Sequence, residues 1–171
     1  MRVLVAGIGN IFLGDDGFGP EVVRRMTPGS GPDPGERPDG VRIVDYGIRG
    51  MHLAYDLLDG YDALVLVDAL PFDGAAGDLR VLEVGPDDVG AAELDAHDMN
   101  PVAVLAAVES LGGTVPPTYV VGCRPGTLEE GIGLSPVVAA AVPVAVELVG
   151  RLLRDIILSA VPTAASLPRG R

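Results

Sequence analysis

Residues 2–20 read RVLVAGIGNIFLGDDGFGP, and this stretch decides the start of the predicted fold. The run Arg2–Ala6 is apolar with little polar alternation, which is typical of a strand covered on both faces. Gly7–Asn10 ends the strand, and a loop with the acidic pair Asp15–Asp16 follows. The next Gly-Pro pair supplies an N-cap and a first helical residue, so the sequence predicts a helix over roughly 20–27.

Strand-like and helix-like patterns alternate along the rest of the chain. Apolar runs predict strands at 41–46, 63–67, 79–84 and 118–122, and helices at about 51–58, 101–111 and 136–157. A short glycine-rich turn precedes strand 79–84 and has no room for a crossover helix, so this strand is expected to pair antiparallel at one sheet edge.

This order of elements predicts an α/β fold. We expect a single three-layer domain over residues 1–157, with a mostly parallel, twisted five-stranded sheet, one antiparallel edge strand and helices on both faces. Residues 158–171 are expected to form a flexible C-terminal tail.

Composition excludes several classes of protein. The chain has 12 basic and 24 acidic residues, a formal charge of -12, so it would repel a phosphate backbone and nucleic acid is not an expected partner.

Cys123 is the only cysteine and no signal-peptide pattern begins the chain, so a cytoplasmic location is expected. The longest apolar run, 137–146, is interrupted by Pro143 and is half of the roughly 20 residues that span a bilayer, so no membrane segment is expected. Oligomeric state is not encoded in these patterns.

Several reactive side chains follow predicted strands. Ligands of open α/β sheets bind beyond the carboxyl ends of the strands, which makes candidates of Asp15, Asp16, Asp45, Asp68 and Cys123. His97 stands just before a helix start, and with two of these carboxylates it would form a metal site that leaves positions open for substrate. Asp95 or Asp98 would orient its second ring nitrogen. The plainer alternative is that the aspartates cap turns and that His97 is a packed or solvated side chain.

Three other interpretations stay open from the residues alone. The glycines of Gly7–Gly9 follow a strand and Asp45 ends the next one, as in dinucleotide-binding folds, although Phe12 stands where a third glycine belongs. Cys123 and His97 would make a minimal nucleophilic dyad, but a buried, inert thiol is the favoured reading. His52, within a predicted helix, is interpreted as a structural or surface residue.

Several motifs together resemble one family. Gly7-Ile-Gly-Asn10 followed by Gly14-Asp-Asp-Gly-Phe-Gly19 resembles the opening of the hydrogenase maturation endopeptidases. The resemblance covers residues 2 to about 155 and continues through Asp45-Tyr-Gly47, Arg49-Gly50, Val67-Asp68-Ala69, His97 and Gly131-Ile-Gly-Leu-Ser-Pro136.

This resemblance implies a function and a site. The family removes a C-terminal peptide from the nickel-loaded precursor of a hydrogenase large subunit. Asp16, Asp68 and His97 match the family's metal-contacting positions, so they are expected to contact nickel supplied by the substrate precursor, with no permanently bound cofactor. Most relatives carry Glu where Asp16 stands, so either the metal lies closer to the loop or a water bridges the gap. Ile48 replaces a common Thr.

The resemblance leaves the chemistry of cleavage open. Nickel would polarise the scissile carbonyl, activate water or only position the peptide, and Asp16 or Asp68 is an alternative general base. A non-hydrolytic, metal-sensing chaperone of the same precursor is the second hypothesis, and a nucleotide-binding module is the third.

Overall fold

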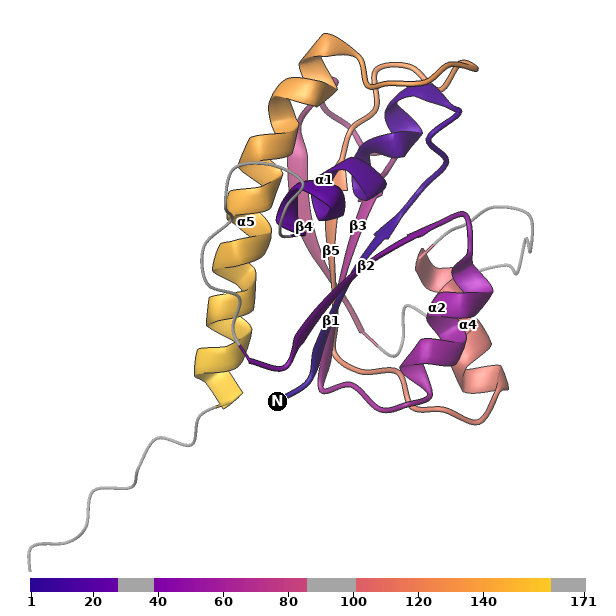
Figure 1. The fold of residues 1–171 in the computed structure, drawn as a ribbon, viewed down its shortest axis with the longest axis vertical. Coiled ribbons are helices and arrows are strands. Elements are labelled where there is room, and N and C mark those ends of the chain that lie inside the picture. Colours follow the sequence, from indigo (N-terminus) through magenta and orange to yellow (C-terminus); the bar gives the residue numbers. More distant parts are fainter. Residues whose placement is uncertain (28–38, 86–100, 161–171) are drawn as a thin grey trace, which may run out of the picture.

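The computed structural model describes residues 1–27, 39–85 and 101–160. Strands and helices alternate through them (Figure 1), in the order β1 (Val3–Ile8), the 3-10 turn η1 (Gly14–Gly17), α1 (Phe18–Met26), β2 (Val41–Gly47), α2 (Gly50–Leu57), β3 (Ala63–Ala69), β4 (Leu79–Val84), α4 (Pro101–Ser110), β5 (Thr118–Cys123) and α5 (Pro136–Ala160).

The strands form one sheet in the order β2-β1-β3-β5-β4. Every neighbouring pair is parallel except β4 with β5, which is antiparallel, and β4 lies at the sheet edge. The predicted sheet is therefore confirmed, including its antiparallel edge strand. Strands β1 and β3 are neighbours in the sheet. From β1 the chain continues to β2 at one edge, whereas from β3 it continues to β4 at the other edge. This reversal of strand order is the position at which open α/β sheets bind ligands.

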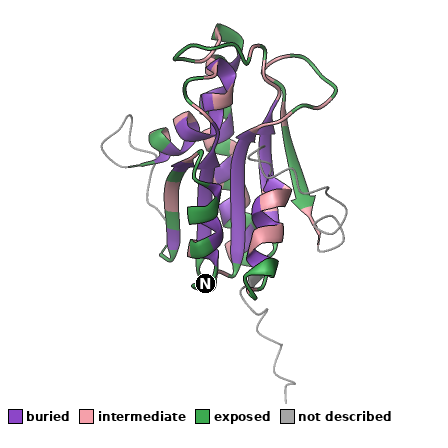
Figure 2. Cartoon of the chain, turned by 90° about the vertical axis from the view of Figure 1, so that its right-hand side faces the viewer, coloured by how far each residue is buried: buried purple, intermediate pink, exposed green. Residues whose placement is uncertain are grey.

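Helices cover both faces of the sheet, which confirms the three-layer arrangement. Helices α1 and α5 share one apolar core with the sheet, and α2 and α4 share a second core on the other face (Figure 1). The six residues of β1 are all buried, as a strand between two helical layers must be. Figure 2 shows the contrast between these buried central strands and the largely exposed edge strand β4.

Two boundaries near the carboxyl end of the sheet differ from the prediction. Helix α1 begins at Phe18, two residues before the predicted start, because η1 leads directly into it and Gly17 takes the N-cap position. Strand β3 continues to Ala69, so Asp68 lies within the strand and pairs with Gly122 of β5. Asp68 is therefore held by ladder hydrogen bonds rather than by a loop.

Helix α5 is longer than predicted and continues through Pro143 to Ala160. By length and composition alone the whole helix is long and apolar enough to cross a membrane, which the run 137–146 by itself is not. One face is nevertheless buried at positions three or four residues apart, from Val138 to Ile156, against α1 and the sheet. This is the packing of an amphipathic helix against the core of the domain. The predicted flexible tail falls largely on residues 161–171, outside the described residues.

Candidate functional site

Asp15 is a fully buried carboxylate that is held by four hydrogen bonds. Its Oδ2 accepts from the N–H groups of Gly126 (2.8 Å) and Thr127 (3.0 Å) and from the Ser135 hydroxyl (2.9 Å), and its Oδ1 accepts from the Ser135 N–H (2.6 Å). Burial raises the pKa of Asp15, but these hydrogen bonds outweigh burial and lower the pKa below its usual value. A carboxylate offers about four lone-pair sites, so Asp15 has none left for a ligand.

The role of Asp15 is therefore structural, and its neighbour is the available acid. Asp16 lies in the same turn, is half-buried, and accepts one hydrogen bond at Oδ2 from the Asn10 N–H at 2.7 Å. Its Oδ1 accepts none from the described part of the chain. The turn is pressed closely against the end of β1, since a Cβ on Gly9 would stand 1.9 Å from the carbonyl oxygen of Asp16. Asp16 is thus fixed in place with one oxygen unused.

Asp68 is the second acid of the site, with only 5% of its surface exposed. Burial raises the pKa of Asp68 well above its usual value, and the negative charge of Asp16 raises it further, against a smaller lowering by the Ala69 N–H. The two carboxylates are therefore close enough to repel each other. A cation bound between them would relieve both the burial penalty and the repulsion.

Helix α1 begins against the ends of β1 and β3, next to the turn η1 that carries Asp16 and the strand β3 that carries Asp68. A Cβ on Gly19 would lie 2.2 Å from the carbonyl oxygen of Val67 and 2.3 Å from that of Ile8, so only glycine allows the helix to sit across β1 and β3. Asp16 in η1 and Asp68 near the end of β3 are thus close enough for their charges to interact, whereas their role as a metal site stays a prediction.

The third predicted ligand, His97, lies outside the described residues, as do Asp95 and Asp98. Within residues 1–27, 39–85 and 101–160, no group of three or more His, Cys, Asp and Glu side chains converges to hold a metal. The acid pair is therefore the described part of the site, and the contribution of His97 stays a prediction.

The remaining candidates have other surroundings. Cys123 is buried, and burial together with the charges of Asp15 and Asp78 raises its pKa to about 11. A nucleophilic thiol needs a lowered pKa, so the structure favours the inert thiol over the dyad. His52 is exposed on α2, as expected of a surface residue.

The glycine-rich turn after β1 is filled by the chain itself. The Gly9 N–H donates to the Gly47 carbonyl at 3.0 Å, and Asp45 accepts from the Gly47 N–H at 2.9 Å. Arg49 holds the same turn by donating to the carbonyls of Asp45 and Tyr46. The groups that would bind a nucleotide phosphate and ribose are thus engaged in a turn, which explains the Asp45-Tyr-Gly47 and Arg49-Gly50 motifs structurally.

Comparison with known proteins supplies the class of chemistry. A family model described as hydrogenase maturation protease, HycI, matches residues 33–152. The chain belongs to the hydrogenase maturation protease family. The Hydrogenase 2 maturation protease of Escherichia coli is 33% identical over 172 residues, covering 96% of this chain and 98% of that protein. A hydrogenase expression/formation protein, HupD, of Rhizobium leguminosarum is 31% identical and covers 98% of this chain and 82% of that protein.

Solved structures agree with this assignment. The hydrogenase maturating endopeptidase HybD from Escherichia coli superposes with a TM-score of 0.71 at 31% identity, covering 91% of this chain and 93% of that one. A hydrogenase 2 maturation peptidase from a Thaumarchaeota archaeon gives a TM-score of 0.66 at 31% identity, covering 90% and 98%. This maturation protease is therefore a peptidase with the fold of the solved endopeptidases, and the predicted family is confirmed.

Proposed function

We propose that this maturation protease removes the C-terminal peptide of a nickel-loaded hydrogenase large-subunit precursor in the cytoplasm, and that Asp16, Asp68 and His97 contact the nickel held by the substrate. The observation that carries the proposal is the acid pair formed by Asp16 of η1 and Asp68 near the end of β3. Asp68 is buried beside Asp16, a costly arrangement that a divalent cation stabilises.

The donor set suits a transient visit by the metal. Two carboxylates and one imidazole are oxygen and nitrogen ligands without a thiolate, so they bind nickel without the strong retention that sulfur ligands give. Three protein ligands leave coordination positions for the groups of the precursor. Nickel therefore stays part of the substrate, and a precursor without nickel gives the acid pair nothing to bind.

The two acids are held in different ways. Asp68 is fixed within β3, while Asp16 is held by the Asn10 N–H and by the turn that Asp15 anchors. Asp16 keeps one oxygen that no described residue uses, and this oxygen is the one available to the nickel of the substrate. The Asp side chain at position 16 is shorter than Glu by one methylene, so the scissile peptide and its nickel approach the turn closely or through a water.

Single substitutions in the three proposed ligands test this function. We expect Asp16→Asn, Asp68→Asn and His97→Ala each to abolish processing of nickel-loaded precursor while the protein stays folded. His52→Ala is the matched control, since His52 is an exposed histidine on α2. The measurement is the mass of the precursor before and after incubation. Full processing by one of the three variants removes that residue from the site.

The same assay separates the protease from a metal-sensing chaperone. A chaperone retains the loaded precursor on an affinity column without shortening it. The proposed protease releases a peptide, and the shortened subunit then leaves the column. Wild-type protein that binds nickel-loaded precursor and leaves its mass unchanged overturns the proposal in favour of the chaperone.

A further inference from the structure

A pocket of about 460 Å³ opens beside the turn that bears Asp16. It is lined by Gly14 and Gly17, which flank Asp15 and Asp16 in η1, by residues of α1, and by the loop 132–134 before α5. The pocket therefore starts next to the candidate site and extends away from it along α1. Nothing in the site described above occupies it.

The end of the pocket near Asp16 is apolar. Ile11 and Ile132 line it and are 47% and 79% exposed, and Leu134 lies between them at Gly17. A Cβ on Gly17 would stand 3.3 Å from the Ile11 Cα and 3.8 Å from Leu134 Cδ2, so glycine leaves the space between these side chains open. Exposed isoleucines around a hollow are typical of a surface that buries an apolar side chain of a partner.

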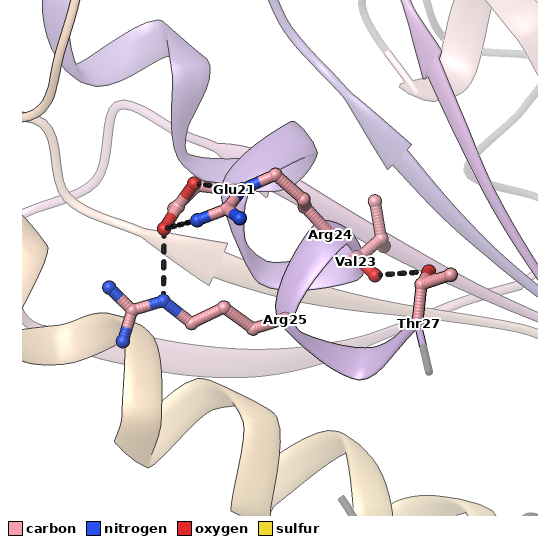
Figure 3. Close-up of polar contacts among 5 residues, drawn as sticks. All are labelled: Glu21, Val23, Arg24, Arg25 and Thr27. Atoms are coloured by element: carbon pink, nitrogen blue, oxygen red, sulfur yellow. Dashed lines mark hydrogen bonds and ion pairs between the residues drawn. The ribbon is translucent and has the colours of Figure 1, made fainter. Parts of the chain in front are cut away.

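The far end of the pocket is polar and carries a cation. Arg24 donates to Glu21 from both Nε and Nη2, at 2.8 Å each, and Arg25 donates to Glu21 from Nε at 2.9 Å. In Figure 3 the terminal nitrogens of Arg25 point away from Glu21. These nitrogens have no partner among the described residues. The lining holds two carboxylates, Glu21 and Asp45, and two guanidinium groups, Arg24 and Arg25, so its charges balance and the terminal nitrogens of Arg25 are the donors left for a ligand.

We propose that this pocket binds the first residues of the precursor's C-terminal extension, just after the scissile bond, with an apolar side chain against Ile11 and Ile132 and a carboxylate at Arg25. The inference rests on the proposed function, because it needs a peptide substrate held at Asp16. The residues before the cut lead into a folded, nickel-containing subunit that does not fit this volume, whereas the extension enters it as a single extended chain.

The dimensions set the length of the bound segment. Gly17 and Arg25 are eight residues apart, at the two ends of the pocket along α1, which corresponds to about 12 Å at 1.5 Å per helical residue. An extended peptide rises about 3.3 Å per residue, so about four residues cover this distance. The apolar contact therefore falls on the first or second residue of the extension, and the carboxylate on about the fourth.

Charge supports an acidic residue at that position. The chain as a whole carries a charge of -12 and repels acidic peptides at long range. Within the pocket, the terminal nitrogens of Arg25 attract a carboxylate at short range, and a carboxylate that reaches them gains a hydrogen-bonded ion pair. A lysine at the same position brings its positive charge against the Arg25 guanidinium, and the two charges repel each other.

Two forms of nickel-loaded precursor test the charge preference, one with Glu and one with Lys as the fourth residue of the extension. We expect the wild-type KM to be about fivefold lower for the Glu form, with a similar kcat for both. Arg25→Glu inverts this preference. Arg151→Glu is the matched control, since Arg151 is exposed on α5 and does not line the pocket, and it keeps the wild-type preference.

A second pair of variants tests the apolar end. Ile132→Asp is expected to raise the KM for the Glu form about tenfold at unchanged kcat, because an apolar contact is lost at a position too exposed to affect folding. Leu128→Asp is the control, since Leu128 is 53% exposed on the same loop but does not line the pocket. Thermal unfolding of each variant checks that the fold is intact.

The outcomes separate this inference from the proposed function. Wild-type protein that leaves both loaded precursors uncut refutes the proposed function and this inference together. Wild-type protein that cuts both forms with equal KM, or an Arg25→Glu variant with the wild-type preference, refutes the pocket alone. An Ile132→Asp variant with unchanged KM refutes the apolar contact.

Discussion

Asp15 and Asp16 are neighbours in sequence, yet the structure predicts opposite consequences for their substitution. Asp15→Asn keeps the size of the side chain but puts an amide N–H₂ where one carboxylate oxygen accepts hydrogen bonds. In the better orientation the amide oxygen takes the three donors at Oδ2, and the N–H₂ faces the Ser135 N–H. Losing one hydrogen bond to a charged group and leaving a buried donor unpaired costs about 3 kcal/mol of the free energy of unfolding. Asp16→Asn, with one hydrogen bond at a half-buried side chain, costs about 1 kcal/mol.

Chemical denaturation followed by circular dichroism measures the free energy of unfolding of both variants, and thermal denaturation measures their melting temperatures. For a domain of this size, about 3 kcal/mol lowers the melting temperature by roughly 6–12 °C. The pKa of Asp15 is lowered in the folded protein, so its stabilisation is fully present above the unfolded pKa near 3.8 and is lost as pH falls through the lower folded value. The difference between wild type and Asp15→Asn therefore narrows below about pH 4. An Asp15→Asn protein within about 1 kcal/mol of wild type at pH 7 refutes the assignment of Asp15 as a structural anchor.

Three further substitutions test the surroundings of the acid pair. Asp68→Asn is expected to lose processing but to unfold at pH 7 at the same denaturant concentration as wild type or a higher one. The reason is that burial and the charge of Asp16 raise the pKa of Asp68, so its ionised form costs stability. A marked loss of stability contradicts this expectation. Gly19→Ala is expected to lower the free energy of unfolding by about 3 kcal/mol in the same assay, because its Cβ meets backbone oxygens at 2.2 and 2.3 Å. The control Gly150→Ala, within α5, is expected to be neutral or stabilising. Equal effects of the two substitutions refute the close approach at Gly19. Cys123→Ala is expected to retain processing of the precursor, since the pKa of about 11 keeps the thiol protonated, and loss of cleavage in a folded variant revives the thiol dyad.

Periodicity and turn residues were enough to predict the sheet. The apolar run at 63–67 predicted a strand and the short turn before 79–84 predicted an antiparallel edge strand, and both are present. These features are local, since they depend on which side chains alternate and on how many residues join two strands. The start of α1 was missed by two residues, because the 3-10 turn that precedes it has no distinct sequence pattern.

The acid pair was predictable only in part. Position after predicted strands made Asp15, Asp16 and Asp68 candidates among others, and the family resemblance selected Asp16 and Asp68. The structural reason for the choice between Asp15 and Asp16 lies in contacts more than 100 residues away in sequence. The donors to Asp15 come from Gly126, Thr127 and Ser135. A helix start at about 136 is predictable from the sequence, whereas the hydrogen bonds of Ser135 to Asp15 depend on the fold. The pocket beside Asp16 was likewise absent from the sequence interpretation, because its walls come from η1, α1 and the loop before α5.

The central claim is that this protease cuts a precursor because the precursor presents nickel to the acid pair. The most direct measurement is the mass of the same large-subunit precursor, nickel-loaded and nickel-free, after incubation with wild-type protein. We predict that the loaded precursor becomes shorter by its C-terminal peptide and that the nickel-free precursor keeps its full mass. Equal cleavage of both forms contradicts the role of nickel, and cleavage of neither contradicts the proposed substrate.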